Sequence, residues 1–198
     1  MKKSIFGFNV HDIVEISLLC ALSIILDKFV KINIGATGGS INIAMFPLFI
    51  IALRHGPFKS FLAGGIVFGL ITCLLDGYGI ITYPLEYLLA FGSIALLGFF
   101  AKTINNNLVK KDVKKSVFAY LIMILCIVGC GVIRVFGATL DSMFIYSYEF
   151  VPALVYNISY ILPSMGFVLV IMCLLLPTIK MINNTFQTSY LMFALKSE

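Results

Sequence analysis

The sequence predicts an all-α integral membrane protein, a single domain over residues 1–198 built as a six-transmembrane-helix bundle with the N and C termini cytoplasmic. The first observation behind this is composition. Hydrophobic residues make up 61% of the chain and charged residues 12%, against about 45–50% and about 25% in soluble domains. A soluble fold of this length could not bury so much apolar surface, whereas lipid can cover it. The second and third observations are the spacing of the apolar runs and the positions of the basic residues.

The apolar runs set the predicted helices. Crossing the ~30 Å hydrocarbon layer takes about 20 helical residues. The first run contains Asp12 and Glu15 and has no small-residue cleavage site, so we expect a retained helix and not a signal peptide. The second is short and carries Pro47, which predicts a late start or a kink. The predicted helices are residues 11–30, 41–54, 58–75, 80–101, 115–137 and 153–182.

The segments between the helices are mostly short. Gly77-Tyr78-Gly79 predicts a tight turn after the third helix. Only residues 102–114 and 138–152 are long enough to be substantial loops. The tail after Lys180 is polar and mixed, so we expect a frayed cytoplasmic end.

The basic residues indicate the orientation. Six spans place eleven of the fourteen Lys and Arg residues on one side and three (Lys28, Lys31 and Arg134) on the other. The positive-inside rule makes the richer side cytoplasmic. The net charge of +5 is therefore explained by orientation in the bilayer and does not indicate a nucleic-acid partner.

Enzymatic functions find little support. The only histidines, His11 and His55, do not form a metal-binding pair, and no serine has a base predicted beside it. The five cysteines lie in apolar stretches and indicate packing. There is no Gly-rich phosphate loop, so any uphill transport must draw its energy from a partner. We predict no catalytic residue, no metal site and no cofactor.

Glu86 is the main candidate for function. It lies about two turns inside the fourth predicted helix, between Tyr83 and Tyr87. A carboxylate in a transmembrane helix must face a cavity or a partner, because exposing it to lipid costs several kcal/mol. One alternative is a buried ion pair with Arg134, near the outer end of the fifth helix. The other is a cationic or hydrogen-bond-donating ligand, with tyrosine rings beside it.

Other polar residues are predicted in the same outer layer. Gly39 and Ser40, with Gly38, precede the second helix, and Tyr146 precedes the sixth. Tyrosines at this depth are ordinarily membrane anchors. Asn157 lies within an apolar run and needs a hydrogen-bond partner, either another helix or a ligand. Together these groups predict an outer pocket suited to a small planar cation.

Small residues mark the first helix. Ser17 and Ala21 are spaced four apart, so they share one helix face and let another helix approach closely. The approaching helix could belong to this chain or to a second subunit.

Three segments resemble the thiamine-specific S-components of energy-coupling factor (ECF) transporters. They are the stretch from Gly38-Gly39-Ser40 through Pro47 to Arg54-His-Gly56-Pro, the run Ala63-Gly64-Gly65-Ile-Val-Phe-Gly69-Leu, and Tyr83-Pro-Leu-Glu86-Tyr87-Leu-Leu-Ala90-Phe91. The resemblance is best over residues 36–101, and the predicted helix number and the absence of an ATPase domain extend it over the chain.

The resemblance implies a function. S-components capture a vitamin outside the bacterial cell membrane and dock on a transmembrane coupling subunit driven by two ATPases. It implies ligand contacts by Glu86, Tyr87 and Asn157. In this hypothesis Tyr83 and Tyr87 provide aromatic walls, and the loop at residues 38–40 acts as a lid, because glycines tolerate the backbone changes that opening demands. It also implies docking on the coupling subunit through the first-helix face of Ser17 and Ala21.

Some positions depart from the family pattern. Thiamine binders carry a histidine four residues after an arginine on helix five, and here Arg134 is followed at that spacing by Ala138. The chain has no tryptophan, and Pro152 replaces an aromatic residue before Asn157. Thiamine is thus the first expected ligand and another B-vitamin or a pyrimidine-like compound the second. A structural membrane protein without a ligand is the competing hypothesis.

Overall fold

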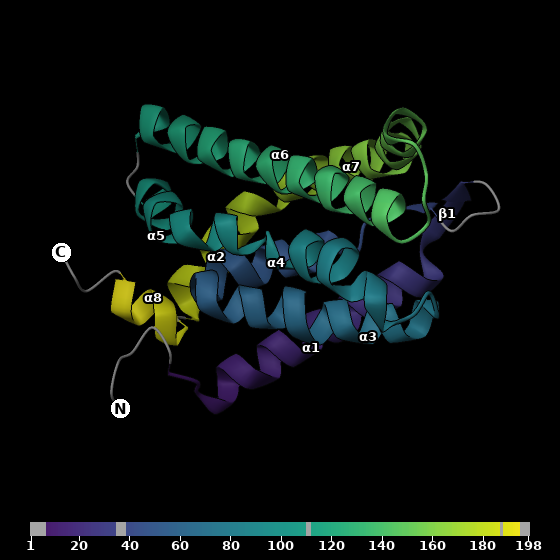
Figure 1. The fold of residues 1–198 in the computed structure, drawn as a ribbon. Helices are drawn as coiled ribbons and strands as arrows, with labels where there is room; N and C mark the ends of the chain where they lie inside the picture. The colour runs from purple at the N-terminus through teal and green to yellow at the C-terminus, as the bar shows by residue number, and fades with distance from the viewer. Residues whose placement is uncertain (1–6, 35–38, 110–111, 187, 195–198) are drawn as a thin grey trace.

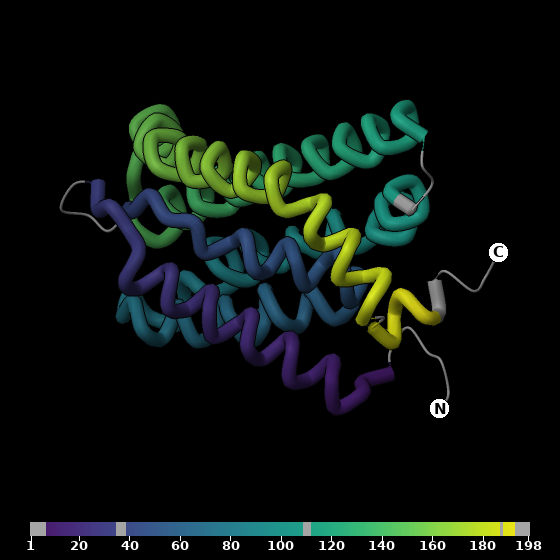
Figure 2. The backbone as a smooth tube through the Cα atoms, turned by 180° about the vertical axis from the view of Figure 1, so that it is seen from behind, coloured from purple at the N-terminus to yellow at the C-terminus, as the bar shows by residue number. Residues whose placement is uncertain are grey.

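Long helices lying side by side make up most of the computed structural model, which describes residues 7–34, 39–109, 112–186 and 188–194 (Figure 1). The helix α1 (Val10–Phe29) closely matches the predicted first helix. It lies along one edge of the bundle, and Figure 2 shows the same arrangement from behind.

A small β-hairpin follows α1 and corrects the purely helical prediction. Strand β1 (Lys31–Ile34) pairs antiparallel with β2 (Gly39–Asn42), and Ile32 lies opposite Ile41. Isoleucines alternate with polar residues in β1, and Ile41 lies between Ser40 and Asn42 in β2. This period of two, with β-branched side chains, favours strand over helix. The second helix therefore begins later than the predicted residue 41.

The second and third predicted helices meet at Gly56. Helix α2 (Met45–Phe61) contains this glycine at φ 77° and ψ −176°, which is not a helical conformation. Glycine adopts a positive φ without steric cost, and Pro57 cannot donate the helical hydrogen bond. Gly98 packs directly on the break, where an added Cβ would lie 2.6 Å from the Cα of Pro57.

The chain reverses direction at this break. Before Gly56 the chain runs antiparallel to α1, because its earlier residues bond to the C-terminal end of α1 and its later residues bond to the N-terminal part. After Gly56 the chain runs parallel to α1, because its earlier residues bond near the start of α1 and its later residues bond near the end. The bonded pairs are Asn42 with Asp27 and Arg54 with Glu15 before the break, and Lys59 with Asp12 and Asp76 with Lys28 after it.

The middle of the chain is built from short pieces that include two π-helical turns. An added Cβ on Gly65 would lie 3.1 Å from the Cα of Gly92, so the two stretches approach closely through glycine. In order the pieces are η1 (Leu62–Phe68), α3 (Gly69–Asp76), η2 (Ile80–Thr82), η3 (Tyr83–Leu89), α4 (Ala90–Gly92) and α5 (Ala95–Val109). Helix α5 takes up most of the expected 102–114 loop.

Two long helices form the other side of the bundle, α6 (Val113–Phe144) and α7 (Phe150–Thr185) (Figure 1). The loop predicted at residues 138–152 is wrong in its first half, because α6 continues through it. The hydroxyls of Thr139 and Ser142 donate to the backbone carbonyls four residues earlier, so both polar side chains bond within the helix. This extension places Asp141 on a helix face instead of in a loop.

The predicted frayed tail is also wrong within the described residues. A short helix, α8 (Ser189–Ala194), follows α7, and Leu191 is fully buried. The Tyr190 ring covers Gly56, and the Thr188 hydroxyl bonds to the carbonyl of Arg54. The tail therefore covers the turn between the second and third predicted helices.

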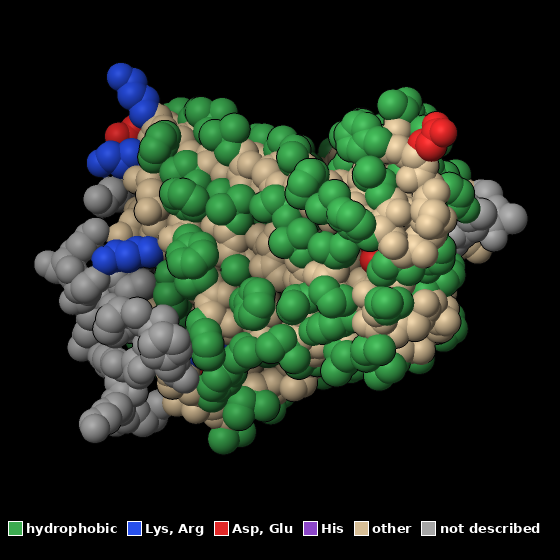
Figure 3. Space-filling model, viewed as in Figure 1, with side chains coloured by type: hydrophobic (Ala, Val, Ile, Leu, Met, Phe, Trp, Pro, Cys, Tyr) green, Lys and Arg blue, Asp and Glu red, His purple; other side chains and the backbone are tan. Residues whose placement is uncertain are grey.

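The surface is that of a membrane protein. Among the described residues four helical stretches are long and apolar enough to span a bilayer, residues 45–76, 80–108, 113–144 and 150–185. Figure 3 shows hydrophobic side chains over the middle of one face, with Lys and Arg gathered at the end where α6 begins. Helix α1 is shorter, with 20 residues, and carries Asp12, Glu15, Asp27 and Lys28.

Candidate functional site

A cavity of about 430 Å³ lies at the end of the bundle that carries the β-hairpin. Its walls come from α1, the hairpin, α3, η3, α4, α6 and α7, so most of the chain contributes to it. Seven of the eight predicted ligand-contact residues line it. They are Gly39, Ser40, Glu86, Tyr87, Arg134, Tyr146 and Asn157.

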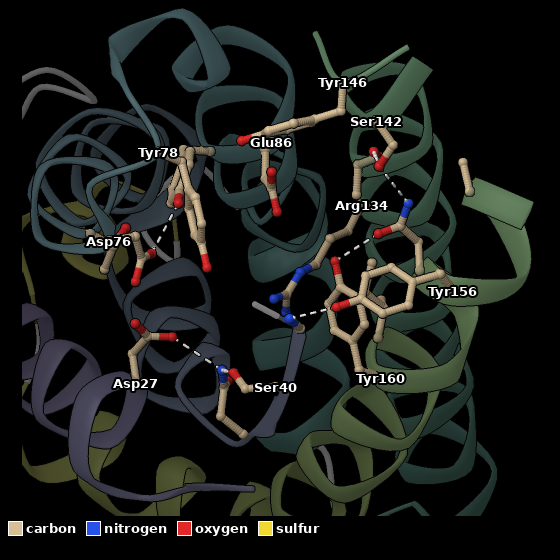
Figure 4. A pocket seen from close by; sticks show the side chains of 18 of the residues that line it. Asp27, Ser40, Asp76, Tyr78, Glu86, Arg134, Ser142, Tyr146, Tyr156 and Tyr160 are labelled. Atoms are coloured by element: carbon tan, nitrogen blue, oxygen red, sulfur yellow. Dashed lines mark hydrogen bonds between the residues drawn. The ribbon is translucent and has the colours of Figure 1, made fainter. Parts of the chain in front are cut away.

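Glu86 projects into this cavity from η3 (Figure 4). Within the described chain, no ion pair of 4.0 Å or less joins Glu86 to Arg134. The structural alternative weighed for Glu86, a locked pair with Arg134, is therefore not what this structure contains.

Arg134 is held by other neighbours. Its Nη1 lies 3.3 Å from the Sδ of Met45, and the guanidinium carbon lies 5.1 Å from the centre of the Phe91 ring. A cation over an aromatic face is stabilised by the ring quadrupole. The guanidinium still influences Glu86 electrostatically, and both side chains point into the same space in Figure 4.

A chain of polar contacts forms the opposite wall. The Tyr87 hydroxyl donates to Asp76 Oδ2 at 2.9 Å, and Lys28 Nζ lies 2.5 Å from Asp76 Oδ1. The same ammonium is 3.0 Å from Asp27. These contacts join α1, α3 and η3 and fix the orientation of the Tyr87 ring at the cavity.

The β-hairpin closes one side of the cavity. The Gly39 amide donates to the Tyr156 hydroxyl at 2.8 Å, and the Asn42 amide donates to Ser164 Oγ at 3.1 Å, so β2 is tied to α7. A Cβ on Gly39 would lie 2.7 Å from Cδ1 of Tyr160, so only glycine fits this approach. Ser40 lines the cavity beside it. Gly38 lies outside the described residues.

Asn157 is buried and fully engaged. Its Nδ2 donates to Ser142 Oγ at 3.2 Å, and its Oδ1 accepts from the Tyr160 hydroxyl at 2.7 Å. The amide therefore links α6 to α7 and also lines the cavity. Both interpretations made from the sequence, helix contact and ligand contact, are compatible with this position.

Two loop tyrosines border the cavity outside the spanning helices. Burial raises the pKa of Tyr146, and the nearby Asp141 and Glu86 carboxylates raise it further. Burial likewise raises the pKa of Tyr78, with Asp76 and Glu86 adding to it. Both phenols therefore remain hydrogen-bond donors at neutral pH, and both experience the negative field of the cavity.

One predicted site residue lies elsewhere. Tyr83 is not among the lining residues, and its hydroxyl donates to the carbonyl of Gly65 at 3.0 Å, so it packs η3 against η1. The two departures from the family pattern, Ala138 and Pro152, both line the cavity. The cavity wall therefore differs from the family pattern at these two positions.

Sequence reasoning missed several lining residues. Asp27 and Asp76 flank apolar helices, and charged residues at such positions were a usable signal. Ser142 falls in a predicted loop and gave no such signal. Ser17 and Ala21 lie away from the cavity and are exposed on α1, with the large apolar side chains Leu18 and Ile25 exposed beside them.

Comparisons with known proteins agree on one family. Residues 13–184 match the family described as Thiamine transporter protein (Thia_YuaJ). The chain is 28% identical over 179 residues to thiamine transporter ThiT of Bacillus subtilis (strain 168), covering 84% of this chain and 90% of that protein. It is also similar to a solved structure of ThiT from Listeria monocytogenes, with a TM-score of 0.71 and 26% identity over 86% of this chain and 97% of the other.

Proposed function

Because the chain belongs to the Thiamine transporter protein family, we propose that it is the thiamine-binding S-component of an ECF importer and binds its vitamin in the cavity around Glu86. It is a multi-pass membrane protein, and its family is one of transporters and not of enzymes. The ligand contacts proposed are those made by Glu86, Tyr87, Asn157, Arg134 and Tyr146, with Gly39 and Ser40 closing the site.

The observation that carries the proposal is the Glu86 carboxylate, which faces a cavity and has no basic ion-pair partner within the described residues. A carboxylate at this depth is costly unless a ligand or a proton compensates it. Thiamine carries a permanent positive charge on its thiazolium ring and hydrogen-bond donors on its aminopyrimidine ring. Aromatic side chains around the carboxylate supply faces for both rings.

The topology proposed for the membrane is six crossings with both ends in the cytoplasm. The reversal at Gly56 supports two separate crossings in residues 45–76, and α1 adds one more to the bundle. The basic residues gathered at the end opposite the cavity support this orientation through the positive-inside rule. The cavity then faces outward.

The partners proposed are a transmembrane coupling subunit and two ATPases. The family pattern places the docking surface on the first helix. Here the exposed Ser17 and Ala21 on α1 support a close helix approach, although larger residues surround them. The chain has no phosphate-binding loop, so the ATPases are separate proteins.

Calorimetric titration of the purified protein against a panel of B-vitamins and pyrimidines tests the function. Thiamine should bind at sub-micromolar concentration and more tightly than the others. Tighter binding of another panel member would move the ligand assignment to that compound, since Ala138 and Pro152 alter the wall. No sub-micromolar binding by any member would refute the S-component proposal and favour a structural membrane protein.

A further inference from the structure

Asn42 is a buried polar residue that the proposed ligand contacts do not use. It ends strand β2, is 6% exposed and lines the cavity. Its Nδ2 donates to Asp27 Oδ1 at 3.1 Å and to Ser40 Oγ at 3.4 Å, and its Oδ1 accepts from the Ala44 amide at 3.2 Å. Both hydrogens of the side-chain amide are therefore directed at protein acceptors, so this group supports the wall of the cavity.

The backbone of Asn42 adds a contact to α7. Its amide donates to Ser164 Oγ at 3.1 Å, and the Ser164 hydroxyl donates to the carbonyl of Tyr160 at 2.7 Å. Because that carbonyl takes the hydroxyl hydrogen, the serine oxygen is oriented to accept from Asn42. Ser164 is buried, so water does not compete for this bond. One residue of β2 thus bonds to α1, to α7 and to Ala44, the residue that precedes α2.

These bonds fix the part of the hairpin that closes the site. Side chains two residues apart in a strand lie on the same face, so Ser40 and Asn42 share the cavity face of β2. Asp27 and Ser40, the two acceptors of the Asn42 amide, lie close together at the cavity in Figure 4. Gly39, at the other end of β2, bonds to Tyr156 on α7. The strand is therefore held at both of its ends.

We propose that Asn42 is a positioning residue that holds β2 against α1 and α7 and retains the ligand by keeping Gly39 and Ser40 at the cavity. This rests on the proposed function, because it assumes that the ligand occupies this cavity. The bond to Asp27 is the strongest of the side-chain contacts, since its acceptor is a carboxylate. Lys28 Nζ lies 3.0 Å from the other oxygen of that carboxylate, which holds it in place. Loss of the bond frees β2, and bound thiamine then leaves faster.

Reversing the direction of the bond tests this role, with affinity measured by calorimetry and dissociation by release of radiolabelled thiamine. Asn42→Asp loses the donor and sets a second carboxylate against Asp27, so thiamine affinity should fall at least about tenfold, mainly through faster dissociation. Adding Asp27→Asn supplies a donor again and keeps the net charge of wild type. This exchanged pair should bind within about threefold of Asp27→Asn alone. Asn33→Asp adds the same charge at an exposed position of β1 and should behave as wild type.

Hydrogen exchange of the empty protein gives a second readout that does not need thiamine. Backbone amides of residues 39–44 should exchange faster in Asn42→Asp and return to the wild-type rate in the exchanged pair. The amides of α6 should exchange as in wild type throughout, which shows that the change is local and not a general loss of stability. Asn42→Ala removes the same side-chain bonds without adding a charge and should also speed exchange in residues 39–44.

The outcomes separate this inference from the proposed function. Wild-type exchange of residues 39–44 in both Asn42 variants would overturn the inference. Affinity lost without faster exchange would also overturn it, because Asn42 would then contact the ligand itself, and so would an exchanged pair that recovers neither property. Absence of thiamine binding by wild type would refute the function, and the exchange rates of the empty protein would still decide whether Asn42 holds β2.

Discussion

Replacing Glu86 by glutamine separates ligand recognition from structural support. The substitution keeps the shape of the side chain and removes its charge. Since no basic side chain pairs with Glu86 within 4.0 Å in the described structure, the empty protein loses no ion pair. The free energy of unfolding of the empty protein should therefore stay the same or rise slightly.

The effect on binding should be large. A unit charge about 4 Å from a ligand cation is worth about 4 kcal/mol at an effective dielectric constant of about 20. The glutamine amide can still accept one hydrogen bond, so the net loss should be that of a charged hydrogen bond, about 1.5–3 kcal/mol. This corresponds to thiamine affinity lowered roughly 10- to 150-fold.

Calorimetry of thiamine binding and thermal unfolding followed by circular dichroism measure the two effects. Glu149→Gln, which removes an exposed carboxylate at the start of α7, is the matched control and should change neither. Unchanged thiamine affinity in Glu86→Gln would show that the carboxylate does not contact the ligand. Destabilisation of about 3–5 kcal/mol would show that Glu86 is instead half of a buried ion pair.

Three further substitutions test other parts of the structure. Gly39→Val places side-chain atoms where Tyr160 lies 2.7 Å from the Cβ position, so the hairpin cannot close and thiamine affinity should fall at least about tenfold in calorimetry. Lys59→Met leaves buried Asp12 without its partner at 2.7 Å and should cost about 3–5 kcal/mol of stability in thermal unfolding. Tyr190→Ala uncovers Gly56 and should cost about 3–5 kcal/mol, with thiamine affinity retained.

Two of these substitutions have matched controls. Gly166→Ala adds a methyl group where no atom outside the local helix lies within 4 Å, so its affinity should match wild type. Combining Lys59→Met with Asp12→Leu removes both charges and should recover most of the lost stability. A stable Lys59→Met single variant would show that the pair is solvated, and a stable Tyr190→Ala would show that α8 does not support the turn.

The membrane class, the family and several residues of the candidate site could be predicted because they depend on local composition and spacing. Apolar runs of about 20 residues report spanning helices whatever packs around them. A carboxylate within such a run, as at position 86, indicates a polar cavity because lipid cannot solvate it. The same reasoning found Arg134 and Asn157, which line the cavity.

Details of backbone and pairing could not be read in this way. Residues 41 and 42 were assigned to the second predicted helix, but pairing with β1 decided for a strand. Asp141 fell in the loop predicted at residues 138–152, but α6 packs against η3 and α7 and continues through this position. Tyr83 and Tyr87 look equivalent in sequence, yet only the helix rotation in η3 decides which ring meets the cavity.

The sequence by itself determined that this chain lies in a membrane and that Glu86 needs a polar environment, since both follow from solvation free energies that each segment carries alone. Only the tertiary structure decided which charges neighbour each other: Lys28 bridges Asp27 and Asp76, whereas no ion pair within 4.0 Å joins Glu86 to Arg134 among the described residues. Electrostatic energy falls with distance between groups far apart in sequence, so the folded arrangement alone sets it.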